Sequence, residues 1–360
     1  MGRNLPEPSF CSQACGGASP PPRSSGETRG GASAEHRRCM TTEITKAGAV
    51  FTARTPEDLL AVVPAVLGFH PEESLVMLTF GGRRAFHARV DLPECEADIG
   101  PVVDTLLAPA LRQRPEKVLF IAYSRDARRA ATTALHASDV FDEHGFAVIA
   151  PLRSDGTSWC HVERDADPEA AEPHAYDVTT HTLTARSVLE GRVTLGSREE
   201  LVSSVAADPD AAARVLAASE SDSARAPGQR EVRALVARGL AGGSGLTDAD
   251  VARLARACLV PGVRDAAWCG LVRETVEEHV ELWRSVVVRT PDELVAGVAA
   301  VLAFAAWLAG HGALAWCAVD RARVSDPDCS LAVLVADLLQ AAVPPTAWSA
   351  IRGSAGAPQA

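Results

Sequence analysis

The spacing of hydrophobic and polar positions divides the chain into three parts. Residues 1–39 show almost no apolar periodicity. From residue 55 to 164, apolar runs typical of strands alternate with apolar residues at helical spacing, and from 229 to 348 only the helical spacing remains. We therefore predict an α/β region with a mixed sheet and helices, followed by an all-α C-terminal region.

The elements expected in the α/β region follow the order α-β-β-α-β-α-β-β. The helices are expected at 55–67, 98–113 and 126–145, and the strands at 74–80, 84–92, 117–124, 146–154 and 157–164. Thr55 is a good helix cap, Pro56 fits the first helical position, and Gly68 fits a left-handed helix end. Pro64 lacks an amide hydrogen, so it is expected to kink or shorten the first helix.

Composition predicts the domain boundaries. Residues 1–42 are rich in Gly, Pro, Ser and Arg and are predicted to be a disordered tail, with Met40 as the natural start of the protein. The α/β domain is expected over 43–205. A polar, Ala-rich and Pro-containing stretch predicts a linker at 206–228, the helical domain spans 229–348, and 349–360 is a second disordered tail.

The helical domain contains a pattern that resembles a tetratricopeptide repeat. Between residues 299 and 328, six positions match the offsets of that repeat: Leu302, Ala303, Gly310, Ala315, Ala322 and Pro327. Such units nest two antiparallel helices and stack on one another. We therefore expect a tetratricopeptide-like array that binds a protein partner.

Charge and apolar length exclude some partners. The net charge of −11 disfavours nucleic-acid binding in the absence of a basic stripe. The stretch 295–319 is long enough to span a bilayer, but it is rich in Ala and Gly, and Gly310-His311-Gly312 interrupts it. We expect a buried helical hairpin there and no membrane contact. Nine cysteines without a C-x-x-C pair, and a start without a signal peptide, predict a cytoplasmic protein.

The stretch 67–78, LGFHPEESLVML, places polar residues between two apolar runs. His70 and Glu72 are the catalytic candidates, because a neighbouring carboxylate can orient a histidine base. The alternative interpretation is a turn between a helix and a strand, made of residue types that favour turns. The strand 84–92 is expected to fold back beside this loop with its polar side chains on one face. The predicted ligand-binding residues are therefore His70, Ser74, Arg89, Asp91 and Trp159.

A second group of residues has the side chains of zinc ligands: Cys160, His161, His174 and His181. Cys160 and His161 are neighbours in an expected strand, so their side chains point to opposite faces. We therefore predict no metal site. The glycine-rich phosphate-binding motifs and the nucleophile elbow do not occur in the sequence, and no cofactor is predicted.

Several long motifs occur in a fixed order from Thr55 to Trp348: TPEDLLAVVPAVLGFHPEESLVML, ARVDLP, DGTSW, GSREELV, RDAAW, LAFAAWLAGHGALAWCAVDRA and DPDCSLAVLVADLL. In these motifs the chain resembles the actinobacterial domain-of-unknown-function family 4192. The resemblance covers nearly the whole ordered chain. It implies a cytoplasmic actinobacterial protein with no assigned reaction, and a start near Met40.

These observations lead to two functional hypotheses. The first is a non-catalytic ligand- or partner-binding adaptor, in which the α/β domain holds a small ligand or peptide near 68–74 and the helical domain binds a protein. The alternative is a hydrolase or transferase that uses His70 with Glu72 or Glu73. The first is favoured, because no catalytic motif is present.

Overall fold

The computed structural model describes residues 42–46, 49–81, 86–189, 194–221, 227–242, 245–268 and 270–348, with side chains except those of 42–52 and 186–189. They belong to one compact unit, Met40–Ala360. The predicted tails, apart from Thr42, and the predicted start at Met40 lie outside the described residues.

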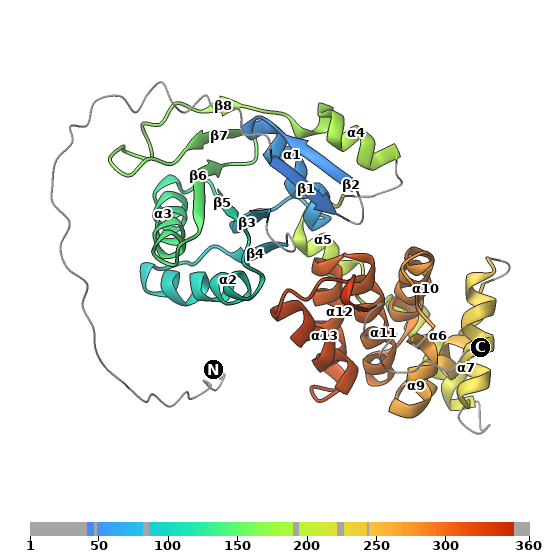
Figure 1. The fold of residues 1–360 in the computed structure, drawn as a ribbon. Coiled ribbons are helices and arrows are strands. Elements are labelled where there is room, and N and C mark those ends of the chain that lie inside the picture. Colours follow the sequence, from blue (N-terminus) through green and yellow to red (C-terminus); the bar gives the residue numbers. More distant parts are fainter. Residues whose placement is uncertain are drawn as a thin grey trace, which may run out of the picture. The chain divides into compact units, whose positions relative to one another are not determined.

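A mixed six-stranded sheet forms the centre of the α/β region (Figure 1), as the sequence predicts. Its strand order is β4-β3-β5-β6-β7-β8, and only the pair β5–β6 is parallel. The strands are β3 Ser74–Phe80, β4 His87–Asp91, β5 Lys117–Tyr123, β6 Ala147–Ser154, β7 Ser158–His161 and β8 His174–Ala175. A separate hairpin, β1 Thr42–Lys46 with β2 Ala49–Ala53, precedes them and was not predicted.

Three helices cover the two faces of this sheet (Figure 1). They are α1 Pro56–Leu67, α2 Ile99–Gln113 and α3 Ala127–Glu143, so the predicted order from α1 to β7 is confirmed. Alternation along β3 directs Leu75 into the core shared with α2 and α3, whereas Val76 packs into the core shared with α1. Both cores exclude water, so the strand reads as a continuous apolar run.

Local sequence signals explain the limits of α1. The Thr55 hydroxyl accepts a hydrogen bond from the Asp58 amide, and the Asp58 carboxylate accepts one from the Thr55 amide, which together form a capping box. Gly68 ends the helix with a φ of 87°. The helix continues through Pro64 to Leu67, so the predicted shortening at Pro64 does not occur.

The named elements that follow β8 in the described part of the chain are all helices. The α-helices are α4 Thr182–Leu189, α5 Arg198–Ser203, α6 Pro209–Ser221, α7 Gln229–Leu240, α8 Asp248–Cys258, α9 Pro261–Trp268, α10 Val276–Arg289, α11 Val295–Ala309, α12 Gly312–Ser325 and α13 Ser330–Gln340. Short 3₁₀ turns occur at Glu96–Asp98, Val178–Thr180 and Asp292–Leu294. The prediction of an all-α region is therefore confirmed.

The structure differs from the predicted linker at 206–228. Helix α6 occupies part of it, and Val215 on this helix is fully buried in the helical core together with Leu201 of α5. The stretch is polar on one side only, and Ala211, Ala212 and Val215 form the apolar side. The average composition of this stretch is polar, so it did not indicate that one side of α6 is apolar and buried.

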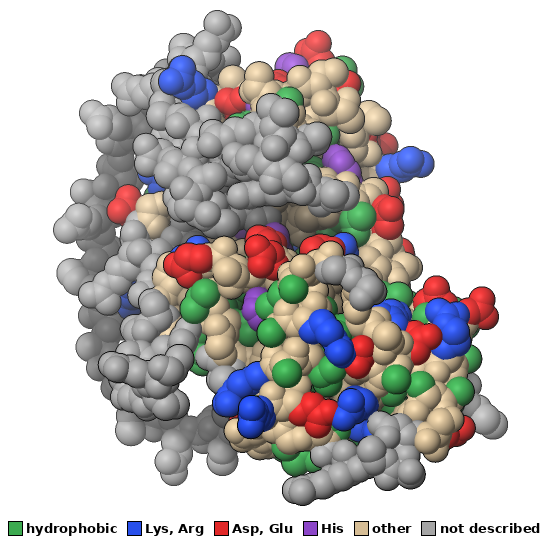
Figure 2. All heavy atoms as spheres, turned by 90° about the vertical axis from the view of Figure 1, so that its right-hand side faces the viewer, with side chains coloured by type: hydrophobic (Ala, Val, Ile, Leu, Met, Phe, Trp, Pro, Cys, Tyr) green, Lys and Arg blue, Asp and Glu red, His purple; other side chains and the backbone are tan. Residues whose placement is uncertain are grey.

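Helices α11 and α12 form the predicted buried hairpin, with Gly310 in a left-handed conformation between them. The segment Asp292–Ala309 is apolar enough to cross a membrane, with a mean hydropathy of 1.7, yet 83% of it is buried inside the protein. It is thus the central helix of this core. Figure 2 shows that, over the described part of one face of the helical region, acidic, basic and hydrophobic side chains are interspersed.

The turn between β6 and β7 depends on one carboxylate. Asp155 accepts hydrogen bonds from the amides of Thr157 at 2.8 Å and Ser158 at 2.7 Å, and from both of their hydroxyls. Burial raises its pKa, but these bonds outweigh burial and lower the pKa from 3.8 to about 2. The charged form therefore stabilises the fold at pH values above 3.8, and this contribution is lost as the pH falls through 2.

We expect Asp155→Asn to lower the free energy of unfolding at pH 7 by about 1 kcal/mol, a value reduced for solvent screening because the residue is exposed. The difference from the wild type should shrink as the pH falls from 4 to 2. Urea unfolding at several pH values measures it. Asp104→Asn on α2, an exposed residue without a side-chain partner among those described, is the control. A difference that does not vary with pH would contradict this assignment.

Candidate functional site

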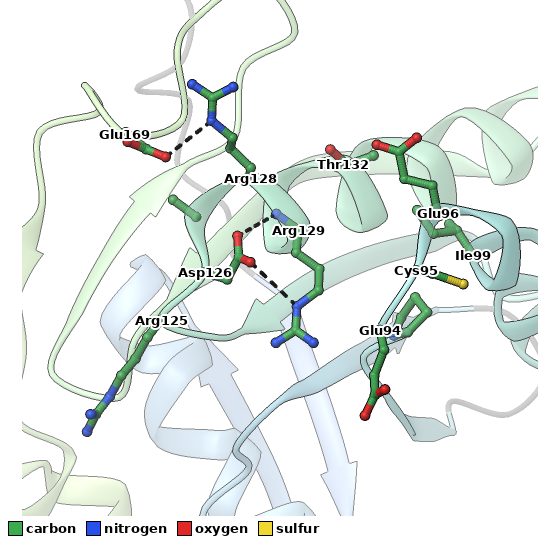
Figure 3. Close-up of a pocket in the computed structure, with 12 residues that line it drawn as sticks. Glu94, Cys95, Glu96, Ile99, Arg125, Asp126, Arg128, Arg129, Thr132 and Glu169 are labelled. Atoms are coloured by element: carbon green, nitrogen blue, oxygen red, sulfur yellow. Dashed lines mark hydrogen bonds and ion pairs between the residues drawn. The ribbon is translucent and has the colours of Figure 1, made fainter.

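A cavity of about 520 Å³ opens at the carboxyl end of β5 (Figure 3). It lies between the loop that follows β4 and the loop that leads from β5 into α3. In α/β sheets this edge, beyond the carboxyl ends of parallel strands, is where ligands commonly bind. The volume falls in the usual range for small-molecule sites.

One wall of the cavity is acidic. It consists of Glu94, Cys95 and Glu96, which follow β4 and are all exposed. The Cys95 thiol donates a hydrogen bond to the Asp98 carboxylate at 2.9 Å. The hydrogen bond to Asp98 thus orients the Cys95 thiol in the cavity wall.

The other wall is basic and lies at the start of α3. Asp126 caps this helix by accepting a hydrogen bond from the Arg129 amide at 2.9 Å. Figure 3 shows Arg128 directed towards Glu169, with 3.1 Å between Arg128 Nε and Glu169 Oε1. Arg125 extends on the far side of the cavity from Glu94. One side of the cavity therefore carries carboxylates and a thiol, whereas the other carries guanidinium groups together with the carboxylates of Asp126 and Glu169.

Glu73 connects the elements around this edge. The start of β3 lies beside the end of β5, because the two strands are antiparallel. The Glu73 carboxylate accepts a hydrogen bond from the Ser124 hydroxyl at 3.0 Å and forms an ion pair with Arg129. Its carbonyl accepts a hydrogen bond from the Leu92 amide at 2.8 Å. Glu73 thereby joins the ends of β4 and β5 to the start of α3.

The backbone of Glu73 is left-handed, with a φ of 40°. Residues other than glycine rarely adopt this conformation, which costs on the order of 1 kcal/mol and occurs preferentially at functional sites. From the sequence, Glu73 was expected only as a partner for His70. Ser124 and Arg129 were not predicted, because their position shortly after a buried strand is the only feature of the sequence that marks them.

Ser74, Arg89 and Asp91 lie together, but on the opposite face of the sheet from Glu73. Arg89 donates from Nε to the Ser74 hydroxyl at 2.8 Å and pairs with Asp91 at 2.6 Å. Burial lowers the pKa of Arg89, and the charge of Asp91 acts in the opposite direction. Arg89 lies opposite Val76, whose side chain packs towards α1, whereas the cavity is lined by residues of α2 and α3, so this cluster and the cavity are separate.

His70 and Glu72 do not join either group. The His70 amide donates to the Leu195 carbonyl at 3.1 Å, and its ring has no hydrogen-bond or ion-pair partner among the described residues. Glu72 is exposed, and its backbone carbonyl accepts a hydrogen bond from the Ser74 hydroxyl at 2.5 Å. Neither residue lines the cavity.

Trp159 belongs to the core beneath α1. Its indole donates to Glu57 at 3.1 Å, and its ring stacks on His174 with 4.6 Å between centroids. Trp159 thus contacts the start of α1, whereas His70 follows the end of this helix, and no contact between the two residues is seen.

The zinc-type residues are also engaged elsewhere. Cys160 is buried, His161 is exposed, and His181 lies 3.1 Å from Asp58. Burial raises the pKa of Asp58, but hydrogen bonds from Arg54, Thr55 and His181 outweigh it and lower the pKa. Among the described residues, no three or more His, Cys, Asp or Glu side chains are arranged to hold a metal ion.

Comparison with known proteins identifies the family. The family described as "Domain of unknown function (DUF4192)" matches residues 56–346. No curated protein and no solved structure matches the chain. The match extends from α1 to beyond α13 and includes the cavity, which agrees with the motifs found between Thr55 and Trp348. The chain therefore belongs to the DUF4192 family.

Proposed function

We propose that this protein is a non-catalytic binding protein that holds a small polar ligand in the cavity at the carboxyl end of β5. The observation that carries the proposal is the cavity itself, about 520 Å³ in volume and lined by charged groups from two separate loops. Its position at the sheet edge supports it, because there the strands and α3 hold the lining residues in place.

The contacts of Glu73 add to this support. A carboxylate held in left-handed backbone by Ser124 and Arg129 stabilises the arrangement of the cavity walls before any ligand arrives. Such preorganisation favours binding, because less ordering is left to be done when the ligand enters. The contacts of the Glu73 carboxylate with Ser124 and Arg129 offset the strain in the Glu73 backbone.

The alternative of a hydrolase or transferase has weaker support. Its general base was His70, which does not line the cavity and has no carboxylate partner among the described residues. No histidine is among the described residues that line the cavity. A general base must lie within reach of the proton that it removes.

A protein partner for residues 229–348, bound by a tetratricopeptide-like array, stays a prediction. The packing of α10, α11 and α12 on one another in chain order supports it. So does Val324 on α12, whose side chain is 72% exposed. Capture of the same partner by a Val324→Asp variant would count against it.

A tryptophan in place of Thr132 tests the ligand-binding proposal. Thr132 is exposed on α3 and lines the cavity, so Thr132→Trp should fill it and weaken binding at least about tenfold, or about 1.4 kcal/mol. The probe is the fraction of a cell extract below about 1 kDa, small enough for a cavity of this class. Molecules retained by the protein in equilibrium dialysis are identified by mass spectrometry.

His136→Trp is the matched control. His136 is exposed one turn further along α3 and does not line the cavity. This variant should retain the same molecules as the wild type. Retention of nothing by the wild type, or equal retention by Thr132→Trp, would contradict the proposed function.

A further inference from the structure

We propose that the ligand of the β5 cavity is a small zwitterion with an amino group at one end and a carboxylate at the other, such as a short peptide with free ends. This inference rests on the proposed function. It follows from the charges in the cavity that the protein itself leaves without a partner.

Two of the lining carboxylates have no partner. The side chains of Glu94 and Glu96 make no hydrogen bond or ion pair with any other described residue. Both belong to the loop after β4, and no lysine or arginine of that loop accompanies them in the cavity wall. This wall therefore presents negative charge that a cationic group of a ligand would neutralise.

The opposite wall leaves one cation free. Arg128 pairs with Glu169 and Asp167, and Arg129 pairs with Glu73 and Asp126, so these two guanidinium groups are already compensated. Arg125 has no partner among the described residues. Figure 3 places it at the rim on the other side of the cavity from Glu94 and Glu96, where its exposed side chain extends outwards. A guanidinium binds a carboxylate with two parallel hydrogen bonds, which makes it a suitable group for the anionic end of a ligand.

The size of the cavity and the separation of these charges favour a ligand longer than one amino acid. The two unpaired carboxylates belong to the loop after β4, and the unpaired guanidinium belongs to the loop after β5. A single ligand can contact both loops only if its positive and negative groups lie at its two ends. A peptide with free termini has this distribution of charge whatever its side chains are. Its backbone also supplies donors and acceptors for the polar lining between the walls.

Four pools of the same random tripeptides test the inference. One pool has free ends, one is acetylated at the amino end, one is amidated at the carboxyl end, and one carries both caps. The full chain is dialysed against each pool, and the retained peptides are quantified by mass spectrometry. We expect the free-ended pool to be retained at least about tenfold more strongly than either singly capped pool.

Two variants assign the ends of the ligand. Glu94→Gln with Glu96→Gln should bring retention of the free-ended pool down to that of the acetylated pool, because the amino group no longer meets a carboxylate. Arg125→Gln should bring it down to that of the amidated pool. All three positions are exposed, so these variants are expected to fold.

Equal retention of capped and free pools, or retention of none, would overturn the inference. If no pool is retained while the wild type still retains small molecules that Thr132→Trp does not, the ligand is of another class and the proposed function stands. If Thr132→Trp and the wild type behave alike with the extract and with every pool, the proposed function fails together with the inference.

Discussion

Replacing Gly297 by alanine is expected to lower the free energy of unfolding by about 3 kcal/mol. Gly297 lies in the first turn of α11, where this helix crosses the end of α8. A methyl group there would lie 2.2 Å from the carbonyl oxygen of Cys258 and 2.5 Å from its carbonyl carbon. These atoms belong to the backbone, so the two helices must move apart. The loss of packing exceeds the gain of about 1 kcal/mol that alanine brings to a helix.

Gly312→Ala is the matched control for this prediction. Gly312 begins α12, and a methyl group there would meet no other residue closer than 3.9 Å, the distance to a Leu339 methyl. Its effect should stay within about 0.5 kcal/mol. Urea unfolding followed by circular dichroism measures both variants. A Gly297→Ala protein as stable as the Gly312→Ala protein would show that the two helices are not in such close contact.

Replacing Phe141 by alanine is expected to cost about 4 kcal/mol of stability. Phe141 is fully buried on α3, with its ring centroid 5.0 Å from that of Phe120 on β5 and 5.3 Å from that of Phe146. Removal of the ring leaves a cavity between helix and sheet, and the edge-to-face contact with Phe120 is lost with it. Because α3 carries the basic wall of the ligand cavity, the variant should also bind ligand more weakly.

Glu143→Ala, exposed near the end of the same helix, is the control and should change stability by no more than about 0.5 kcal/mol. Phe141→Leu should fall between the two, because it keeps most of the buried volume. Chemical denaturation of the three variants provides the comparison. Equal stability of Phe141→Ala and Glu143→Ala would mean that α3 does not depend on this aromatic contact.

Much of the secondary structure was predictable, because it depends on neighbours in the chain. The apolar run that predicts a strand at 74–80 is β3, and the cap at Thr55 begins α1. Thr290 also precedes a proline and two acidic residues, but it ends α10, and its hydroxyl donates to the Val286 carbonyl instead of capping the next helix. A threonine can therefore cap the start of a helix or close the end of one, depending on which carbonyl or amide its hydroxyl contacts.

The site was much less predictable. Strand alternation correctly placed Arg89 and Asp91 on one face, beside Ser74. It did not reveal that Glu73 faces the other side, towards residues more than fifty positions further along the chain. The predicted set therefore combined three residues that do lie together with His70 from the loop after α1 and Trp159 from the core beneath α1.

The sequence by itself determined the family, the α/β and all-α regions, the limits of several strands and the amphipathic faces, because these depend on residue type and spacing over a few turns. Only the tertiary structure decided which strands are neighbours. The pairing of β3 with β5 brings Glu73 to Ser124 and Arg129 and opens the cavity beside Cys95. A two-residue period tells which side chains share a face, but strand order is set by packing between distant segments, and the site depends on that order.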